Sequence, residues 1–582
     1  MHGRAEWRPL RIRRMSDTSQ KRKLRSNFPR GSYLWAARNA HWQALGIPEE
    51  DCEKPKIAIV NSSSDLAACF SHLDRIVPVV KEAIRAAGGV PFEVRTSAPS
   101  DFITGAGARG AYMLAVRDLI TNDIEASVEG AQLDGMVCLT SCDKTIPGQL
   151  MAAARLDVPT IMVPCGYQAS GQYKGQHVDV EDVFLGSMHV MTGKLDREDL
   201  VGMSRVAIRS PGVCTGLGTA NTLHVACEAL GMALPGSAPV RALSERMYED
   251  ARAAGARIVQ MVWVDLRPSA ILTEGAFRNA VTAVLAIGGS LNAVKHLQAV
   301  ATEGRTGVDV YGLFERLSPE VPVVAGLRPV GEHFMEEFDD GGGARALLKQ
   351  LLPRLDANVM TVSGATLAEN LRSYEVGNPQ VIRPLDKPLA TMPAVMVLRG
   401  SLAPETALIK TGLAVRKSRR FEGPAVVFDT RDGALDAIRE GRIKPGDVVV
   451  MRGAGPCGGP AMGGGASLVV FALDGAGLGD EVAVLTDGHL SGLVCKGLVV
   501  AEVSPESARG GPLALVERGD RIVIDLDTRC VDLEVPEDEL ARRRAAWRPP
   551  APAFDRGWLQ IYRDNVSPLP QGAVLVRQRE AT

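Results

Sequence analysis

From about residue 55, short runs of aliphatic and β-branched residues alternate with helical stretches. KIAIV (56–60) is followed by a polar loop and then by an amphipathic stretch that ends near residue 88. The same order returns at LDGMVCLT (133–140), which leads through a second polar loop into a helical segment and then into VPTIMVPCG. Strands that alternate with helices predict parallel β-α-β units, and strands that are apolar throughout suit a sheet covered on both faces. The pattern predicts an α/β fold with a doubly wound parallel sheet.

The pattern changes near residues 375–395, where VGNPQVIRPLDKPLATMPA contains four prolines and shows no helical period. Short strand-like segments follow, among them AVVFD, GDVVVMRG, GDEVAVLTDG, GDRIVIDLD and DLEV. Many short strands at close spacing predict a β-rich domain such as a barrel. A length of 582 residues also exceeds one typical domain of roughly 150 residues. We therefore expect a basic N-terminal tail (1–30), an α/β domain (31–385) and a β-barrel-like domain (386–582).

The charge of the chain limits its partners. Lys and Arg number 66 against 68 Asp and Glu. The chain therefore has no overall positive electrostatic field that would attract nucleic acid or an anionic membrane. No apolar run approaches the roughly 18 residues of a membrane span. The first thirty residues hold ten Arg or Lys but no apolar core of a secretory signal. We interpret them as a solvated tail, or as residues upstream of a start at Met15; a basic binding arm and an Arg-rich transit peptide stay open as alternatives.

Ten cysteines are scattered along the chain without a C-x-x-C pair, which argues against zinc ribbons and thioredoxin-type sites. Together with the missing secretory signal, this predicts reduced thiols and a cytoplasmic location. Three cysteines sit inside apolar strands or helices and are expected to be packing residues: Cys138, Cys227 and Cys530. Cys52 is expected on a surface loop. Cys165, Cys457 and Cys495 stay unassigned.

The sequence SCDKTIPG (141–148) places a thiol, a carboxylate and an amine in succession between a predicted strand and a predicted helix. A helix N-terminus favours a thiolate at Cys142, and Asp143 is a hard oxygen ligand suited to Mg²⁺. Taken alone, the segment fits a buried cysteine and a helix-capping aspartate better. However, Cys69 and Cys214 lie in two further loops expected at the same sheet edge. Three such thiols predict an iron–sulfur cluster with one iron open to substrate.

Longer segments carry a resemblance that extends from about Leu24 to Leu575. They include GGVPFEVRT, LDGMVCLTSCDKTIPGQLMAAARL, TANT, EALGMALPGSA, AIGGSLNAVKHL, TLAEN, VIRPLDKPL, LRGSLAPETALIKT, DGAGLGDEVAVLTDGHLSG and VSPESARGGPLALVERGD. In these segments the chain resembles the dihydroxy-acid dehydratase/6-phosphogluconate dehydratase family, which includes sugar-acid dehydratases. The resemblance implies an α/β N-terminal domain and a β-barrel C-terminal domain with the active site between them. It also implies a homodimer or homotetramer.

The resemblance assigns roles to individual residues. It implies that a [2Fe–2S] cluster is bound by Cys69, Cys142 and Cys214. It implies that Mg²⁺ is bound by Asp101 and Asp143, with Lys144 beside them either as the amine or as a carbamate that supplies a third oxygen. Ser491, in DGHLSG, matches the catalytic serine of the family.

Two positions depart from the family pattern. Gly464, in GPCGGPAMGGGAS, stands where the family has a third Mg²⁺ carboxylate, a glutamate. Leu493 stands where the family usually has threonine or serine, two residues beyond the catalytic serine. The first change puts Mg²⁺ affinity in doubt, and the second makes one wall of the site apolar. We therefore expect a divergent member of the family.

The activity that the resemblance implies is that of a hydro-lyase. Its substrate would be a 2,3-dihydroxy acid, either a branched-chain precursor or a sugar acid, and its product a 2-oxo acid. A non-catalytic, metabolite-binding descendant is the alternative, and Gly464 is its support. A thiol hydrolase or redox protein is disfavoured because no readable motif pairs a cysteine with a histidine.

Overall fold

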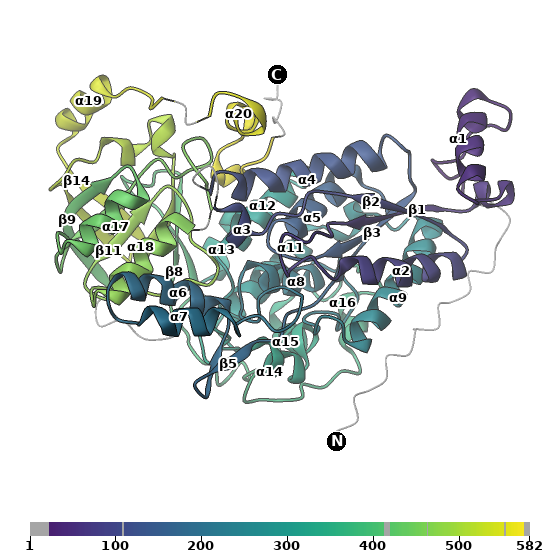
Figure 1. The fold of residues 1–582 in the computed structure, drawn as a ribbon, viewed down its shortest axis with the longest axis horizontal. Helices are drawn as coiled ribbons and strands as arrows, with labels where there is room; N and C mark the ends of the chain where they lie inside the picture. The colour runs from purple at the N-terminus through teal and green to yellow at the C-terminus, as the bar shows by residue number, and fades with distance from the viewer. Residues whose placement is uncertain (1–21, 107–109, 413–418, 463, 552–553, 576–582) are drawn as a thin grey trace.

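The computed structural model describes residues 22–106, 110–412, 419–462, 464–551 and 554–575 (Figure 1). Residues 1–21 of the basic tail lie outside this range. Within the rest of the predicted tail, Leu24 and Ser26 are buried, and the Ser26 hydroxyl donates to Asp134 Oδ2 at 2.6 Å. Among the described residues, no helix combines the length and apolar character needed to cross a bilayer.

The N-terminal part contains a four-stranded parallel sheet in the order β2 (Val90–Arg95), β1 (Lys56–Asn61), β3 (Gly135–Thr140) and β4 (Thr160–Pro164). Every residue of β1, β3 and β4 is buried, as expected for strands covered on both faces. One face is covered by α2 (Leu73–Ala86) and α9 (Glu245–Val264), and the other by α4 (Tyr112–Val128) and α5 (Thr145–Leu156) (Figure 1). The predicted doubly wound sheet is confirmed.

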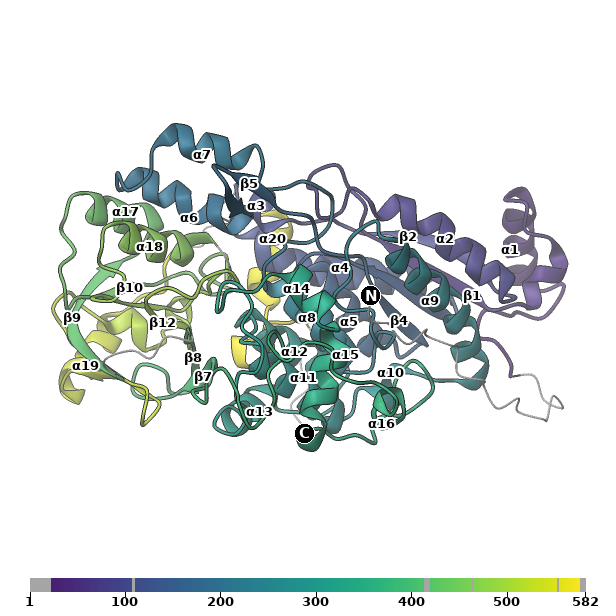
Figure 2. The same cartoon turned by 90° about the horizontal axis from the view of Figure 1, so that it is seen from below.

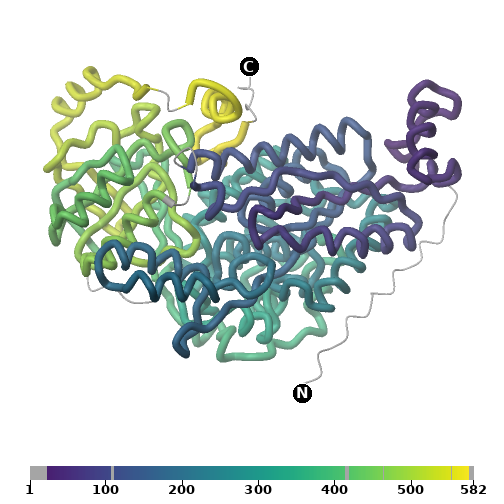
Figure 3. Tube along the Cα trace, in the orientation of Figure 1, coloured from purple at the N-terminus to yellow at the C-terminus, as the bar shows by residue number. Residues whose placement is uncertain are grey.

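A layer of buried helices lies beyond α5. Each residue of α8 (Thr219–Ala229) and α12 (Asn292–Glu303) is buried, and α12 packs against both α5 and α13 (Val310–Leu317). The remaining helices and strands of the N-terminal part are α1 (Tyr33–Ala44), α3 (Asp101–Thr104), β5 (Gly171–Tyr173), β6 (Gln176–Val178), α6 (Val180–Met191), α7 (Arg197–Ser204), α10 (Pro268–Ile271), α11 (Glu274–Ala286), α14 (Met335–Asp340), α15 (Gly343–Leu351) and α16 (Leu367–Leu371). α1 projects from one end of the molecule (Figure 3).

The C-terminal part is built on one eight-stranded sheet. Its order is β14 (Cys530–Glu534), β13 (Arg521–Asp525), β9 (Arg420–Phe428), β10 (Val448–Met451), β11 (Ala483–Thr486), β12 (Leu498–Ser504), β8 (Thr406–Lys410) and β7 (Val395–Leu398). The strands β9 to β12 run parallel, and α17 (Arg431–Arg439) and α18 (Gly464–Gly475) connect them (Figure 2). A bridge between Arg399 and Cys530 joins the two edges of the sheet. The predicted barrel-like sheet is confirmed.

The chain returns to its N-terminal part after the barrel-like sheet and α19 (Glu537–Ala546). Helix α20 (Gly557–Asn565) packs beside α4 (Figure 1), and the Trp558 indole N–H donates to the Ala115 carbonyl at 3.2 Å. The buried Arg117 guanidinium donates to the Ala573 carbonyl at 2.6 Å. The two parts are therefore joined both by the connection before β7 and by this C-terminal segment.

Candidate active site

A cavity of about 310 Å³ lies where the N-terminal part meets the barrel-like part. The N-terminal part lines it from the loops that follow β1 and β3, from α3 and from the loop before α8. The barrel-like part adds Arg431, Leu468 and the segment from Ser491 to Leu493. A larger cavity, of about 570 Å³, is lined by Arg155 and Glu303 and contains none of the predicted site residues. The smaller cavity is therefore the candidate active site.

The three cysteines that were predicted to act together all line this cavity. A hydrogen bond from the Cys142 thiol lowers the pKa of Cys69, and the same bond, together with burial, raises the pKa of Cys142. Burial and then the neighbouring Cys69 raise the pKa of Cys214. The charges on Cys69, Asp143 and Asp101 also oppose the thiolate that the start of α5 is predicted to favour at Cys142. Cys142 has a left-handed backbone, with φ of 64°.

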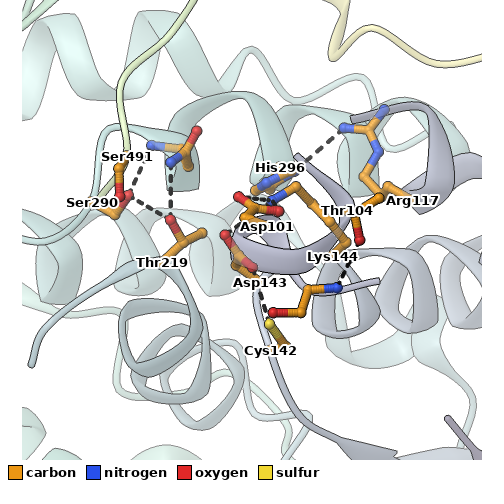
Figure 4. Close-up of polar contacts among 12 residues, drawn as sticks. Asp101, Thr104, Arg117, Cys142, Asp143, Lys144, Thr219, Ser290, His296 and Ser491 are labelled. Atoms are coloured by element: carbon orange, nitrogen blue, oxygen red, sulfur yellow. Dashed lines mark hydrogen bonds and ion pairs between the residues drawn. The ribbon is translucent and has the colours of Figure 1, made fainter. Parts of the chain in front are cut away.

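Two carboxylates surround the buried amine of Lys144 (Figure 4). Its Nζ donates to both oxygens of Asp101, at 2.7 and 2.8 Å, and to Asp143 Oδ2 at 2.9 Å. Burial and then Asp143 raise the pKa of Asp101 to about 7. For Asp143, burial is outweighed by the charge of Lys144, so its pKa is lowered; both aspartates raise the pKa of Lys144 against its own burial.

This donor set suits a hard cation, because Asp101 and Asp143 already converge on one positive charge. A divalent ion at the same carboxylates would require Lys144 to give up its own charge. A carbamate on Lys144 meets that requirement and adds an oxygen ligand. The residues present therefore fit a magnesium site of the kind that the sequence predicts.

Ser491 lies in the loop between β11 and β12, and it lines the cavity with the cysteines and both aspartates. Its backbone N–H donates to the Ser467 hydroxyl at 2.9 Å, and its Oγ accepts from the backbone N–H of Leu493 at 3.4 Å. Asn292, on α12, donates to the Leu490 carbonyl at 3.2 Å. The serine is thus presented by a loop whose backbone is held on several sides.

The two departures from the family pattern both lie in the barrel-like part. Gly464 is the first residue of α18. Leu493 lines the cavity together with other apolar side chains: Phe102, Met113, Phe184 and Leu468. Phe184 packs edge-on against Phe102, with ring centroids 5.7 Å apart. Part of the cavity lining is therefore apolar.

Sequence reasoning missed two residues of the site. Asn221 donates to the carbonyls of Cys214 and Gly216, at 2.7 and 2.9 Å, and so holds the Cys214 loop. Asn221 belongs to the segment TANT, which is part of the family resemblance, but the sequence alone assigned no role to it. Arg431, at the start of α17, lines the cavity from the barrel-like part. No local signal marked it, since it falls where the sequence predicts short strands and turns.

The other cysteines test the packing predictions. Cys138 and Cys227 are fully buried, as predicted. Cys530 is half-buried at the start of β14. Cys52 is buried, so its prediction as a surface-loop thiol is wrong: its short helix is covered by the segment around Asn27 and Asn39.

Comparisons with known proteins cover nearly all of the chain. Residues 54–370 match the family model "Dihydroxy-acid/6-phosphogluconate dehydratase N-terminal", and residues 380–573 match the corresponding C-terminal model. A dihydroxy-acid dehydratase from Ignicoccus hospitalis is 41% identical over 91% of this chain and 95% of its own length. Similar proteins of the same name come from Methanothermobacter thermautotrophicus, at 40% identity over 91% of this chain and 96% of its own length, and from Methanothrix thermoacetophila, at 39% over 95% and 100%.

Proposed function

The chain belongs to the dihydroxy-acid/6-phosphogluconate dehydratase family, and from that membership we propose that it is a hydro-lyase acting on a 2,3-dihydroxy carboxylic acid. The product would be a 2-oxo acid. One observation carries the proposal: a single cavity collects three cysteines, two aspartates and Ser491 from separate segments of the chain.

We propose that two inorganic groups belong to this site. Cys69, Cys142 and Cys214 supply soft thiolates for a [2Fe–2S] cluster. Asp101, Asp143 and a carbamylated Lys144 supply hard oxygens for Mg²⁺. When bound, these groups would supply Lewis acidity at the hydroxyl that leaves and at the carboxylate end of the substrate.

The protein side chain that moves a proton is Ser491. As an alkoxide, it takes the proton from C2, and the electron pair of that C–H bond forms the C2–C3 double bond as the C3–O bond breaks. The 3-hydroxyl leaves as hydroxide and takes a proton from solvent to give water. The resulting enol then tautomerises to the 2-oxo acid. The Leu493 N–H at Ser491 Oγ supports this role, since a fixed donor favours negative charge on that oxygen.

The lining of the cavity bears on the choice between substrates. Leu493, Leu468, Phe184 and Met113 offer no hydrogen-bonding side chain to a polyhydroxylated tail. A site that leaves substrate hydroxyls without partners discriminates against them. We therefore propose a branched or otherwise aliphatic dihydroxy acid ahead of a sugar acid. We also propose a homo-oligomeric, cytoplasmic enzyme; none of its ten cysteines, all of which are described, forms a disulfide.

The test is anaerobic purification followed by metal analysis and a substrate panel. We expect a reddish-brown protein with iron and sulfide, and Mg²⁺-dependent formation of 2-oxo acid from dihydroxyisovalerate in preference to gluconate, arabinonate, xylonate or glycerate. A colourless protein without iron after anaerobic purification would remove the cluster. Cluster-loaded protein that turns over no acid in the panel would favour the non-catalytic alternative.

A further inference from the structure

A cluster of buried polar side chains lies directly behind the loop that carries Ser491. Lys295 Nζ lies 2.5 Å from Glu502 Oε1, and the Tyr311 hydroxyl donates to Glu502 Oε2 at 2.8 Å. His489 Nε2 lies 3.0 Å from Glu502 Oε1, a close contact that does not have the geometry of a hydrogen bond. None of these four side chains lines the cavity, and each residue is at most 3% exposed. The proposed reaction does not use them.

Glu502 reaches this position from an unusual backbone conformation. Its φ is 52°, the left-handed region that favours glycine, and it falls where the pairing of β12 with β8 shifts register between Ala501 and Ser504. Strained residues at strand irregularities persist where the surroundings require them, and they cluster at functional sites. The Glu502 N–H donates to the Gly488 carbonyl at 2.8 Å. Both its backbone and its side chain therefore contact the Ser491 loop.

His489 connects Glu502 to the backbone next to Ser491. Its Nδ1 lies 2.8 Å from the Leu490 nitrogen and 2.9 Å from the Leu490 oxygen. A neutral imidazole at Nδ1 either accepts from the N–H or donates to the carbonyl, depending on which ring nitrogen carries the proton. The negative charge of the Glu502 carboxylate, 3.0 Å from Nε2, favours the proton on Nε2. Nδ1 is then an acceptor for the Leu490 N–H, and the Leu490 carbonyl stays with Asn292.

We propose that Glu502 is a positioning residue for the Ser491 base, because it fixes the tautomer of His489 and thereby the backbone of Leu490. The proposal rests on the function proposed above. Without Glu502, the His489 proton is free to move to Nδ1, where it competes with Asn292 for the Leu490 carbonyl. The backbone just before Ser491 then has two arrangements instead of one. A serine displaced by about 1 Å can lose on the order of 100-fold in rate.

The test replaces the buried ion pair by apolar side chains of similar size, with Lys295→Met and Glu502→Leu in one protein. Such a replacement leaves no unpaired buried charge and is often neutral for stability. The matched control is Arg155→Met with Glu303→Leu. Glu303 is also on α12, its side chain is buried, and it pairs with Arg155 at 2.7 Å, but neither residue contacts the Ser491 loop.

At equal iron content, we expect the Lys295/Glu502 variant to lose on the order of 100-fold in kcat. Its KM should stay within about two-fold of the parent value, because Ser491 acts on the C2 proton and does not hold the substrate. The control variant should keep the parent kcat. The ¹⁵N spectrum of His489 should change from the Nε2–H to the Nδ1–H form. His489→Leu removes the Nδ1 acceptor of the Leu490 N–H and keeps the Lys295–Glu502 pair. It should show the same loss in kcat.

Three outcomes would contradict the proposal. The first is a Lys295/Glu502 variant, or His489→Leu, with the kcat of an active parent. The second is an unchanged His489 tautomer in the Lys295/Glu502 variant. The third is an equal loss of kcat in the Arg155/Glu303 control. If the parent itself turns over no acid, the proposed function fails separately, and the ¹⁵N measurement still decides whether Glu502 sets the tautomer.

Discussion

The backbone N–H of Leu493 is directed at the hydroxyl of Ser491, with the nitrogen 3.4 Å from Oγ. The residue two positions beyond the serine thus contributes through its backbone, while its side chain forms part of the apolar wall. Replacing a hydroxyl-bearing residue by leucine changes the wall without removing this donor. The two functions of this position can therefore be tested separately.

Ser491→Ala should leave the fold and the cluster spectrum intact, because one loop hydroxyl contributes little to stability. Turnover should fall by 10²–10⁴-fold, the usual contribution of a general base. Exchange of the substrate C2 hydrogen with deuterated solvent should fall in parallel. A rate equal to that of the parent, measured at matched iron content, would assign proton removal to another group.

Leu493→Thr should shift the substrate preference toward polyhydroxylated acids. The backbone donor to Ser491 remains, so kcat on the preferred acid should keep its order of magnitude. The ratio of kcat/KM for gluconate to that for dihydroxyisovalerate should rise by roughly ten-fold, the scale of a small change in a pocket wall. An unchanged ratio would show that Leu493 does not contact the distal part of the substrate.

Cys142→Ser should abolish the visible absorption and the activity together, because a hard oxygen replaces a soft thiolate poorly. Cys227→Ser is the matched control: Cys227 is fully buried on α8 and lines no part of the cavity. The control should keep its iron, sulfide and colour. Iron and sulfide that survive in Cys142→Ser would refute the ligand assignment.

Gly464→Glu restores the carboxylate that the family has at this position. If the loop accepts the longer side chain, the variant should bind Mg²⁺ more tightly than the parent, by ten-fold or more. Titration calorimetry of both cluster-loaded proteins with Mg²⁺ measures the difference. Equal dissociation constants would place residue 464 away from the metal.

Glu181→Gln should change the pH dependence of stability. Burial and then Asp179 raise the pKa of Glu181 to about 8, and its Oε2 has no hydrogen-bond partner among the described residues. The stability contributed by its proton is complete below the unfolded pKa of about 4.5 and is lost as the pH rises through about 8. Glutamine is neutral throughout, so the melting temperature of the variant relative to the parent should increase between pH 5 and pH 9.

Thermal unfolding at several pH values measures this difference. Glu245→Gln is the control, since Glu245 is exposed at the start of α9. A melting-temperature difference for Glu181→Gln that stays constant from pH 5 to pH 9 would contradict the prediction.

The order of strands and helices was predictable where local pattern and burial agree. KIAIV and LDGMVCLT became β1 and β3 because continuous apolar runs suit strands covered on both faces. The polar loops after them, with Cys69 and Cys142, lie together because parallel strands end at one edge. The parallel strands of the barrel-like sheet were not predictable. β10 and β11 pair directly, but they are separated in the sequence by helix α18, so their pairing is not local.

The buried polar side chains behind the Ser491 loop were beyond sequence reasoning for a different reason. Lys295 is far in the chain from His489 and Glu502, and it meets them only through tertiary packing. In the sequence, Lys295 lies within a helical pattern and Glu502 within an apolar run, where each resembles a surface residue. The charges that raise the pKa of Cys142 were beyond sequence reasoning for the same reason, because Cys69 and Asp101 come from other segments.

Arg117, deep in the first part of the fold, takes its carbonyl partner from Ala573, near the end of the chain. A ribosome reaches residue 573 only after the strands of both sheets have been made. The segment that contains Arg117 therefore leaves the ribosome before the guanidinium can donate to the Ala573 carbonyl. Cotranslational folding can form the first sheet, but the interface around α4 closes only after α20 has emerged. Nascent chains stalled before residue 557 would expose this interface to chaperones and proteases.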